Sequence, residues 1–302
     1  MKLERLRRGL WGVLATPFHG PALDTDLDSL RREVDLYLGV PADGLVVLGV
    51  FGEGAALDSY EQASVVRTVA EQAPDTPLVV GVSARTTAVA VEQSRTAARA
   101  AGMHLAGVMV QVNSADPAQL ARHFEAVHAA TGAGIVIQDY PEASGVRVQP
   151  TALLEVIEQS PWVVAVKSEA PPTSAAIGQI AHRTDVPVFG GLGGVGLLDE
   201  LSAGAAGAMT GFSHPEGLRV ALDAYSAGGF TAARDAFAPW LPLVNFEAQP
   251  GIGLALRKEI LRHRGILADS SVRPPARPAP EELLDLLAGH LATVPQAQQG
   301  FA

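Results

Sequence analysis

Short apolar runs alternate with longer stretches of helical periodicity along most of this chain. The apolar runs are bounded by Gly or Pro, which is typical of buried β-strands. They lie at residues 12–15, 44–48, 77–82, 107–112, 134–138, 163–167, 186–189 and 207–210. The stretches that follow them repeat apolar residues at helical spacing. They predict helices at residues 27–38, 59–72, 87–101, 117–130, 150–159, 173–182, 196–203 and 216–227.

Eight strand–helix units in succession predict a parallel sheet buried on both faces, because every connection is long enough for a crossover. Eight is also the number of strands that closes a barrel, so we expect an α/β fold, a (β/α)8 TIM barrel, over residues 1–228. Residues 229–302 predict further helices at 230–244, 253–264 and 280–292. We expect this C-terminal helical appendage to pack on the barrel as one structural unit, and residues 296–302 to be frayed.

The sixth apolar run ends on a lysine, in the sequence Trp162-Val163-Val164-Ala165-Val166-Lys167-Ser168-Glu169. Lysine is among the residues least often buried. Side chains alternate along a strand, so we expect Lys167 and Glu169 on one face, with Val163 and Ala165 on that same side. Burial lowers the pKa of an amine and makes it a nucleophile for carbonyl carbons, whereas a nearby carboxylate favours the ammonium form. An interior ion pair is the alternative interpretation.

A barrel of this type carries its active site at the carboxyl ends of the strands and in the loops that follow them. Lys167 stands at such an end. Six other strand ends complete the expected pocket, at residues 49–54, 81–85, 111–114, 138–141, 190–194 and 211–214. Arg85, Arg147 and His214 lie in or near these loops, and each is a candidate for substrate contact or an incidental surface residue.

Composition narrows the classes of function. The net charge of -10, with no Lys/Arg-rich tract after Arg5-Leu6-Arg7-Arg8, argues against nucleic acid or an anionic membrane as partner. The apolar core of a signal peptide and membrane-length apolar runs are both absent, so we expect a cytoplasmic protein. Without cysteine, the chain cannot form disulfides or thiolate metal sites. The histidines show no metal-ligand spacing, so we expect no metal and no cofactor.

Several motifs occur in order along nearly the whole chain. They are Ala15-Thr16-Pro17-Phe18, residues 44–49 leading to Gly52-Glu53, Tyr140-Pro141, Ser144-Gly145-Val146, Val166-Lys167 and Arg273-Pro274-Pro275. Their collinearity resembles the dihydrodipicolinate synthase and N-acetylneuraminate lyase family, the lysine-dependent pyruvate aldolases and dehydratases. The resemblance implies a homotetramer built as a dimer of dimers.

The chain also departs from the usual pattern of that family. Val50 and Phe51 stand where two hydroxyl residues are usual, and Gln138-Asp139 replaces a tyrosine followed by asparagine. Ala143 aligns with an arginine that holds a second carboxylate in dihydrodipicolinate synthase, and residues 111–114 lack a tyrosine pair. Lysine biosynthesis is therefore disfavoured.

One branch of the family fits better. Gln138-Asp139, Lys167-x-Glu169, Gly190-Gly191-Leu192 and residues 256–261 (LRKEIL) resemble the branch that includes 2-keto-3-deoxy-sugar-acid dehydratases. The resemblance implies a Schiff-base lyase in which a 2-oxo acid condenses with Lys167 and Glu169 removes a proton from C3, so that the C4 hydroxyl leaves. Retro-aldol cleavage to pyruvate and an aldehyde is the alternative outcome of the same imine.

The remaining candidate residues would bind substrate. We expect Gln138, at a strand end, to hold a substrate hydroxyl or to be satisfied by the backbone instead. Asp139 and Glu53 rival Glu169 as the base, and we favour Glu53 as a brace of its loop. The amides of the loop after the second strand could hold the substrate carboxylate. The substrate-binding set is Val50, Phe51, Gly52, Asp139, Gly191 and Leu192.

Two alternatives belong to other classes of function. The loss of hydroxyls at Val50 and Phe51 suggests a barrel that binds a ligand without catalysis. The sequence Gly191-Leu192-Gly193-Gly194-Val195-Gly196 satisfies the G-x-G-x-x-G pattern, which suggests an oxidoreductase with a nicotinamide site. The following strand lacks the acidic residue that a ribose needs, so we favour a loop that binds phosphate or other substrate oxygens.

Overall fold

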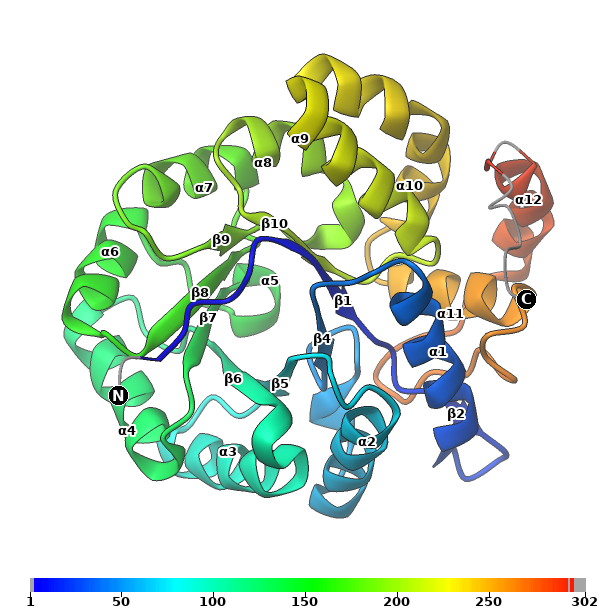
Figure 1. Cartoon of the computed structure of the whole chain (residues 1–302). Helices are drawn as coiled ribbons and strands as arrows, with labels where there is room; N and C mark the ends of the chain where they lie inside the picture. Colours follow the sequence, from blue (N-terminus) through cyan, green and yellow to red (C-terminus); the bar gives the residue numbers. More distant parts are fainter. Residues whose placement is uncertain (1–2, 293, 296–302) are drawn as a thin grey trace.

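Eight parallel strands form the barrel in the computed structural model, which describes residues 3–292 and 294–295 (Figure 1). The strands are β1 (Gly9–Val13), β4 (Gly44–Val47), β5 (Leu78–Val82), β6 (Leu105–Gln111), β7 (Ile135–Asp139), β8 (Val163–Ser168), β9 (Val188–Phe189) and β10 (Gly207–Thr210). Their order in the sheet is β10-β1-β4-β5-β6-β7-β8-β9. A bridge between Gly190 and Ala208 joins the two edges and closes the ring. The predicted TIM barrel is therefore confirmed.

Helices surround the barrel, as Figure 1 shows. Those that follow the barrel strands are α1 (Leu27–Gly39), α2 (Ser59–Gln72), α3 (Thr87–Ala101), α4 (Pro117–Thr131), α6 (Pro150–Gln159), α7 (Thr173–Ala181), α8 (Leu197–Ser202) and α9 (Pro215–Phe237). The chain continues into α10 (Leu241–Glu247), α11 (Gly253–His263) and α12 (Glu281–Leu291). The predicted fraying of residues 296–302 falls outside the described residues.

Local sequence explains several helix starts. Asp26 and Asp116 each accept backbone amides of the first helical turn, and Pro117 occupies the first position of α4. Asp58 and Glu61 form a capping box at the start of α2. These local contacts account for the good agreement between predicted and observed bounds in this half of the chain.

Some predicted bounds were wrong. β1 begins at Gly9, not at residue 12, because its pairing with β10 starts at Gly207 and extends the strand ahead of the apolar run. The break predicted between the helices at 216–227 and 230–244 is present within α9, because Gly229 is non-helical, with φ 68° and ψ -157°, and the chain kinks there. The second predicted helix continues past Phe237 through a 3-10 turn (Ala238–Trp240) into α10. Several short elements were not predicted, among them the hairpin strands β2 (Phe18–His19) and β3 (Asp24–Thr25) and the helix α5 (Pro141–Ser144).

The barrel core has two layers, and a register shift between β7 and β8 decides which residues enter each. Ile135 pairs with Val163, but Val136 pairs with Ala165, so Val164 is an extra residue in β8. Val164 and Ala165 both pack inside the barrel, whereas Val163 packs in the outer layer against the helices. The expectation that Val163 and Ala165 share a face was therefore wrong, because a bulge interrupts strict alternation.

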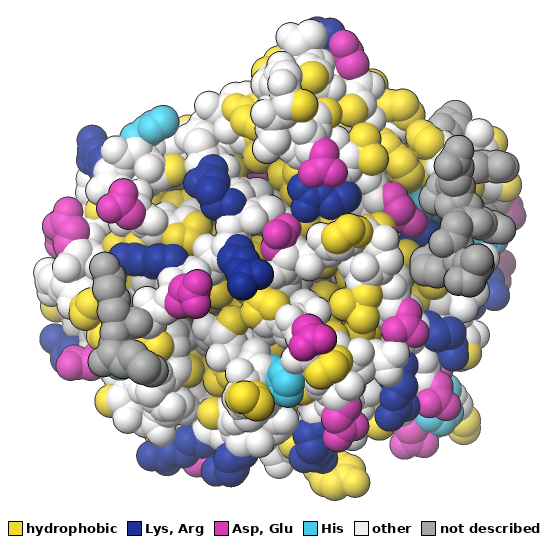
Figure 2. All heavy atoms as spheres, viewed as in Figure 1, with side chains coloured by type: hydrophobic (Ala, Val, Ile, Leu, Met, Phe, Trp, Pro, Cys, Tyr) yellow, Lys and Arg dark blue, Asp and Glu magenta, His cyan; other side chains and the backbone are white. Residues whose placement is uncertain are grey.

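The N-terminal segment closes the end of the barrel opposite the carboxyl ends of the strands. Leu6 donates its backbone amide to Val164 at 3.2 Å and packs in the barrel interior, and Arg5 donates to the carbonyl of Val163 at 2.8 Å. A hollow of about 420 Å³ lies beside this segment, lined partly by Trp11 and Met103. Basic and acidic side chains are intermingled on the face seen in Figure 2.

In residues 3–292 and 294–295, no helix has the length and apolar character needed to cross a membrane. Nor do the His, Asp and Glu side chains of those residues gather into a group that could hold a metal ion.

Candidate active site

Lys167 and Glu169 meet at the carboxyl end of β8. The lysine Nζ lies 3.3 Å from Glu169 Oε1, and the two side chains are 7% and 5% exposed. They therefore share one face, as strand alternation beyond the bulge requires. A buried amine beside a carboxylate is an arrangement suited to attack on a carbonyl carbon, because the carboxylate can take up the ammonium proton.

Glu169 is held by two further groups from neighbouring strands. Gln138 lies opposite Lys167 in the β7–β8 register, and its Nε2 donates to Glu169 Oε2 at 2.9 Å. The amide of Leu192 donates to Glu169 Oε1 at 3.4 Å. Gly191 lets the carboxylate come this close, because a Cβ at that position would overlap Glu169 Oε1. The carboxylate is thus oriented from both sides, and Gln138, Gly191 and Leu192 lie around it.

Asp139 lies differently from Gln138. It pairs with Ser168 in register and stands one residue after Gln138, so alternation turns it toward the helices and away from the barrel interior. Its Oδ1 has no hydrogen-bond partner among the described residues. Burial, with a smaller effect of Glu169, raises the pKa of Asp139 to about 6. This placement favours Glu169 over Asp139 as the base.

The loop after β4 combines free amides with an apolar side chain. The amides of Val50, Phe51 and Gly52 donate no hydrogen bond within the described residues. The Val50 side chain is exposed, with 45% of its area accessible. The Phe51 ring packs toward the barrel interior, and Gly211 leaves the space for it. Thr16 Oγ1 donates to the carbonyl of Gly52 at 2.6 Å and fixes the loop. Three unpaired amides in one loop can hold a carboxylate.

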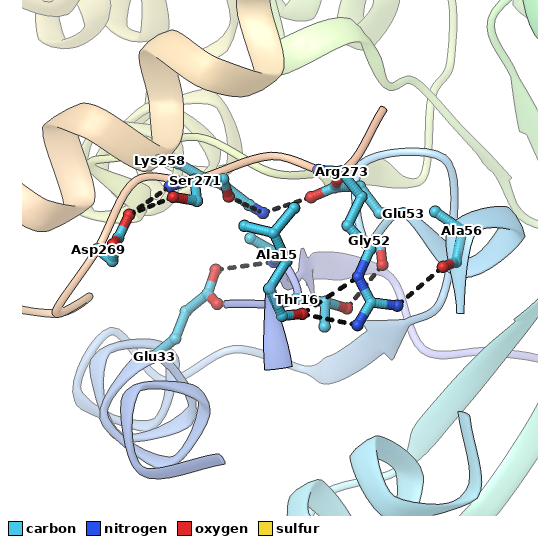
Figure 3. A network of polar contacts seen from close by, with 11 residues as sticks. Ala15, Thr16, Glu33, Gly52, Glu53, Ala56, Lys258, Asp269, Ser271 and Arg273 are labelled. Atoms are coloured by element: carbon cyan, nitrogen blue, oxygen red, sulfur yellow. Dashed lines mark hydrogen bonds and ion pairs between the residues drawn. The ribbon is translucent and has the colours of Figure 1, made fainter. Parts of the chain in front are cut away.

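Glu53, the other candidate for the base, forms its polar contacts with the C-terminal segment of the chain (Figure 3). It pairs with Lys258 Nζ from α11 and accepts the backbone amide of Arg273 at 2.9 Å. Lys258 is fully buried, donates to the carbonyl of Ser271 at 2.9 Å and lies 4.3 Å from the centre of the Phe18 ring. Glu53 thus braces its loop against the C-terminal segment.

His214, Arg85 and Arg147 stand apart from the Lys167–Glu169 pair. Burial lowers the pKa of His214 to about 3, and the ring lies between Phe212 and Trp240. Arg85 and Arg147 are exposed. Within the described residues, none of the three forms a hydrogen bond or ion pair with Lys167 or Glu169, so nothing in the geometry adds them to the site.

The glycine-rich loop after β9 is explained by close packing. Gly191 faces Glu169, Gly194 faces Leu218, and a Cβ at Gly193 would overlap an Nη atom of Arg257. The sheet is a closed barrel and not the doubly wound sheet that a dinucleotide fingerprint accompanies. The nicotinamide alternative therefore loses its structural context.

Arg257 was missed as a site residue by sequence reasoning. It lies on α11, far along the chain, yet its guanidinium reaches the loops after β4 and β9. The only signal in the sequence was the stretch of residues 256–261 noted in the resemblance. Helical spacing alone could not show which of Arg257 and Lys258 faces the barrel mouth.

Comparisons with known proteins agree with this geometry. The model of the dihydrodipicolinate synthetase family matches residues 7–293. The L-2-keto-3-deoxyarabonate dehydratase of Azospirillum brasilense is 30% identical over 89% of this chain and 88% of its own length. The 4-hydroxy-tetrahydrodipicolinate synthase of Kineococcus radiotolerans is 32% identical over 93% of this chain and 91% of its own.

A solved structure shows the same fold over the whole length. The dihydrodipicolinate synthase of Rhodopseudomonas palustris superimposes with a TM-score of 0.89 at 29% identity, covering 97% of this chain and 100% of the other. The chain therefore belongs to the dihydrodipicolinate synthetase family, a family of lyases.

Proposed function

We propose that this protein is a Schiff-base lyase that dehydrates a 2-keto-3-deoxy sugar acid. The observation that carries the proposal is the buried Lys167–Glu169 pair, with Glu169 oriented by Gln138. One of its relatives is a dehydratase of this substrate class, L-2-keto-3-deoxyarabonate dehydratase.

The reaction begins with the 2-oxo acid at the mouth of the barrel. The amides of Val50, Phe51 and Gly52 hold its carboxylate, and Lys167 attacks its C2 carbonyl. Loss of the carbonyl oxygen as water gives an iminium ion on Lys167. The positive charge on nitrogen makes the C3 protons acidic, because the electrons of a broken C3–H bond can move into the imine.

Glu169 then acts as the base. It takes a proton from C3 to give an enamine, whose electrons expel the C4 hydroxyl. The proton that Glu169 gained can leave with that hydroxyl as water, so the carboxylate is restored. Hydrolysis of the conjugated iminium frees Lys167 and releases an unsaturated 2-oxo acid. The net change is the loss of one water from the substrate.

Condensation of pyruvate with an aldehyde is less well supported. Val50 and Phe51 supply no hydroxyl to relay a proton, and Gln138 occupies the position of the usual tyrosine. Retro-aldol cleavage needs a base that reaches the C4 hydroxyl proton, and Gln138 directs the Glu169 carboxylate by a hydrogen bond to Oε2. Product analysis separates the two outcomes, because only cleavage yields pyruvate and an aldehyde.

The test uses borohydride trapping together with turnover. We expect pyruvate and 2-keto-3-deoxy sugar acids to leave a reduced adduct on Lys167, located by peptide mass analysis, and Lys167→Ala to leave none. Glu169→Gln should still form the adduct, whereas its turnover should fall by about 10²-fold or more, as expected for loss of a general base. No adduct from any of these acids would reject the lyase and favour the binding-protein alternative.

We also propose an oligomeric state, a cellular location and a domain boundary for this protein. We expect a homotetramer in the cytoplasm, without metal or cofactor, and a boundary between barrel and appendage at residues 228 and 229. Light scattering on the purified protein measures the assembly directly.

A further inference from the structure

Arg257 presents unpaired hydrogen-bond donors at the mouth of the barrel. Its side chain is 13% exposed, and its Nε donates to Glu247 Oε2 at 3.1 Å. Glu247 is itself buried and accepts from Ser213 through both the backbone amide and the hydroxyl. Neither Nη atom of Arg257 donates to an acceptor within the described residues. Because each Nη carries two hydrogens, four donors remain available on a largely buried cation.

Two active-site loops hold the guanidinium in place. Its central carbon lies 5.4 Å from the centre of the Phe51 ring, in the loop after β4. On the other side, Gly193 leaves room for an Nη atom that any Cβ would overlap, and this glycine has φ 70°. Arg257 therefore lies between two loops: the loop after β4, whose amides are free, and the loop after β9, whose Leu192 amide donates to Glu169.

The loop after β9 brings Arg257 close to Glu169, because Gly191 meets the Glu169 carboxylate and Gly193 meets the Arg257 guanidinium. Burial and, to a smaller extent, Glu169 raise the pKa of Tyr140 to about 12, and Arg257 opposes that rise. Tyr140 directly follows β7, the strand that carries Gln138. The guanidinium and the Glu169 carboxylate therefore lie against the same short loop, at Gly193 and Gly191 respectively.

We propose that Arg257 binds a second carboxylate at the far end of the substrate, so that the site prefers a dicarboxylic 2-oxo acid over one with a neutral end. This inference rests on the proposed Schiff-base function. A planar guanidinium with free Nη donors matches a carboxylate in a bidentate pair. Because the Glu247 carboxylate already balances the single charge of Arg257, a carboxylate adds less uncompensated negative charge here than a phosphate dianion does.

The experiment compares matched pairs of 2-oxo acids on the native protein. Borohydride trapping at Lys167 is titrated with 2-oxoglutarate against 2-oxopentanoate, and with 2-oxoadipate against 2-oxohexanoate, with pyruvate as reference. In each pair the chain length is constant and only the terminal carboxylate differs. In at least one pair, we expect the diacid to reach half-saturation at a concentration at least about tenfold lower than the matched monoacid. A charge-assisted hydrogen bond to the terminal carboxylate provides a difference of this size.

Variants then test whether Arg257 is the cause. In Arg257→Met with Glu247→Gln, which avoids a buried unpaired carboxylate, the half-saturating concentrations of the two acids should converge. Arg85→Met, an exposed arginine of another barrel-top loop, should keep the preference. Arg257→Lys should keep part of the preference for diacids, because lysine retains the positive charge but cannot form two parallel hydrogen bonds to a carboxylate.

The outcomes separate this inference from the proposed function. A pyruvate adduct without any preference for diacids, or a preference that survives in the double variant, overturns the role of Arg257 and leaves the Schiff-base lyase standing. If pyruvate and all the other acids fail to label Lys167, the proposed function and this inference fall together.

Discussion

At the scale of single residues, buried carboxyl groups divide into those with a charged partner and those without. Glu169 has Lys167, Glu53 has Lys258 and Glu247 has Arg257. Glu33 has none among the described residues: its Oε1 accepts the amide of Ala15 at 3.0 Å, and its Oε2 has no hydrogen-bond partner. Burial raises the pKa of Glu33 to about 8. The folded protein therefore stabilises the neutral, protonated form of Glu33.

The raised pKa of Glu33 makes stability depend on pH. The folded state holds this proton up to about pH 8, whereas the unfolded chain loses it near the ordinary glutamate pKa of 4.5. The contribution to stability is therefore complete below about pH 4.5 and is lost as pH rises toward 8. Glu33→Gln, neutral at every pH, should reduce this decline by on the order of 2–4 kcal/mol, since one pKa unit corresponds to about 1.4 kcal/mol.

Urea unfolding of both proteins at pH 5 and pH 8.5 measures that effect. Glu200, which burial also gives a raised pKa of about 7, remains in the variant, so some decline should persist. An unchanged difference between the two pH values in Glu33→Gln would show that Glu33 is ionised in the folded protein.

At the scale of elements, α11 connects the C-terminal appendage to the barrel through two adjacent residues. Lys258 enters the Glu53 network of Figure 3, and Arg257 reaches the mouth. Arg273, further along the chain, adds an ion pair to Glu61 and donates to the carbonyl of Leu23 at 2.7 Å. The appendage therefore fixes the loop after β4, which carries the amides proposed to hold the substrate carboxylate.

Breaking the Lys258–Glu53 pair from one side should be costly. Lys258→Met leaves Glu53 buried, with the Arg273 amide as its remaining hydrogen-bond partner among the described residues, and we expect a loss of about 3–5 kcal/mol in the free energy of unfolding. Lys258→Met with Glu53→Gln removes the unpaired charge and should regain a large part of that loss. A double-mutant cycle in urea measures the coupling, and additive effects of the two changes would contradict a direct pair.

At the scale of the whole molecule, the residues proposed to react with substrate and the N-terminal segment that stabilises the fold lie at opposite ends of the barrel. The reacting groups lie at the carboxyl ends of β7 and β8, whereas the N-terminal segment covers the opposite end of the barrel. Leu6 seals that end with 7% of its area exposed, beside the hollow of about 420 Å³.

Leu6→Ala should therefore affect folding more than catalysis. We expect a loss of about 2 kcal/mol, near the lower end for a buried leucine, because the adjoining hollow already admits solvent. Turnover per folded molecule should stay within about twofold of the original, since no reacting group moves. Thermal unfolding and active-site titration with borohydride measure the two quantities separately. A large fall in turnover at full folding would show that the two ends of the barrel are coupled.

The barrel and its lysine could be predicted because both depend on local rules. Short continuous apolar runs bounded by Gly or Pro mark the strands, helical spacing marks the crossovers, and the carboxyl ends of parallel strands meet at one end of a barrel. These rules place Lys167 and Glu169 on one face before any coordinate is known. They failed at Val163, where a bulge in β8 shifts the register.

The sequence by itself determined the eight strand–helix units, the position of Lys167 at a strand end and the carboxylate beside it, because covalent geometry sets the direction of neighbouring side chains. Only the tertiary structure decided that Glu53 pairs with Lys258, 205 residues away, and that Arg257 reaches the mouth. Such pairings depend on how distant segments pack, and the spacing of residues along the chain carries no information about those distances.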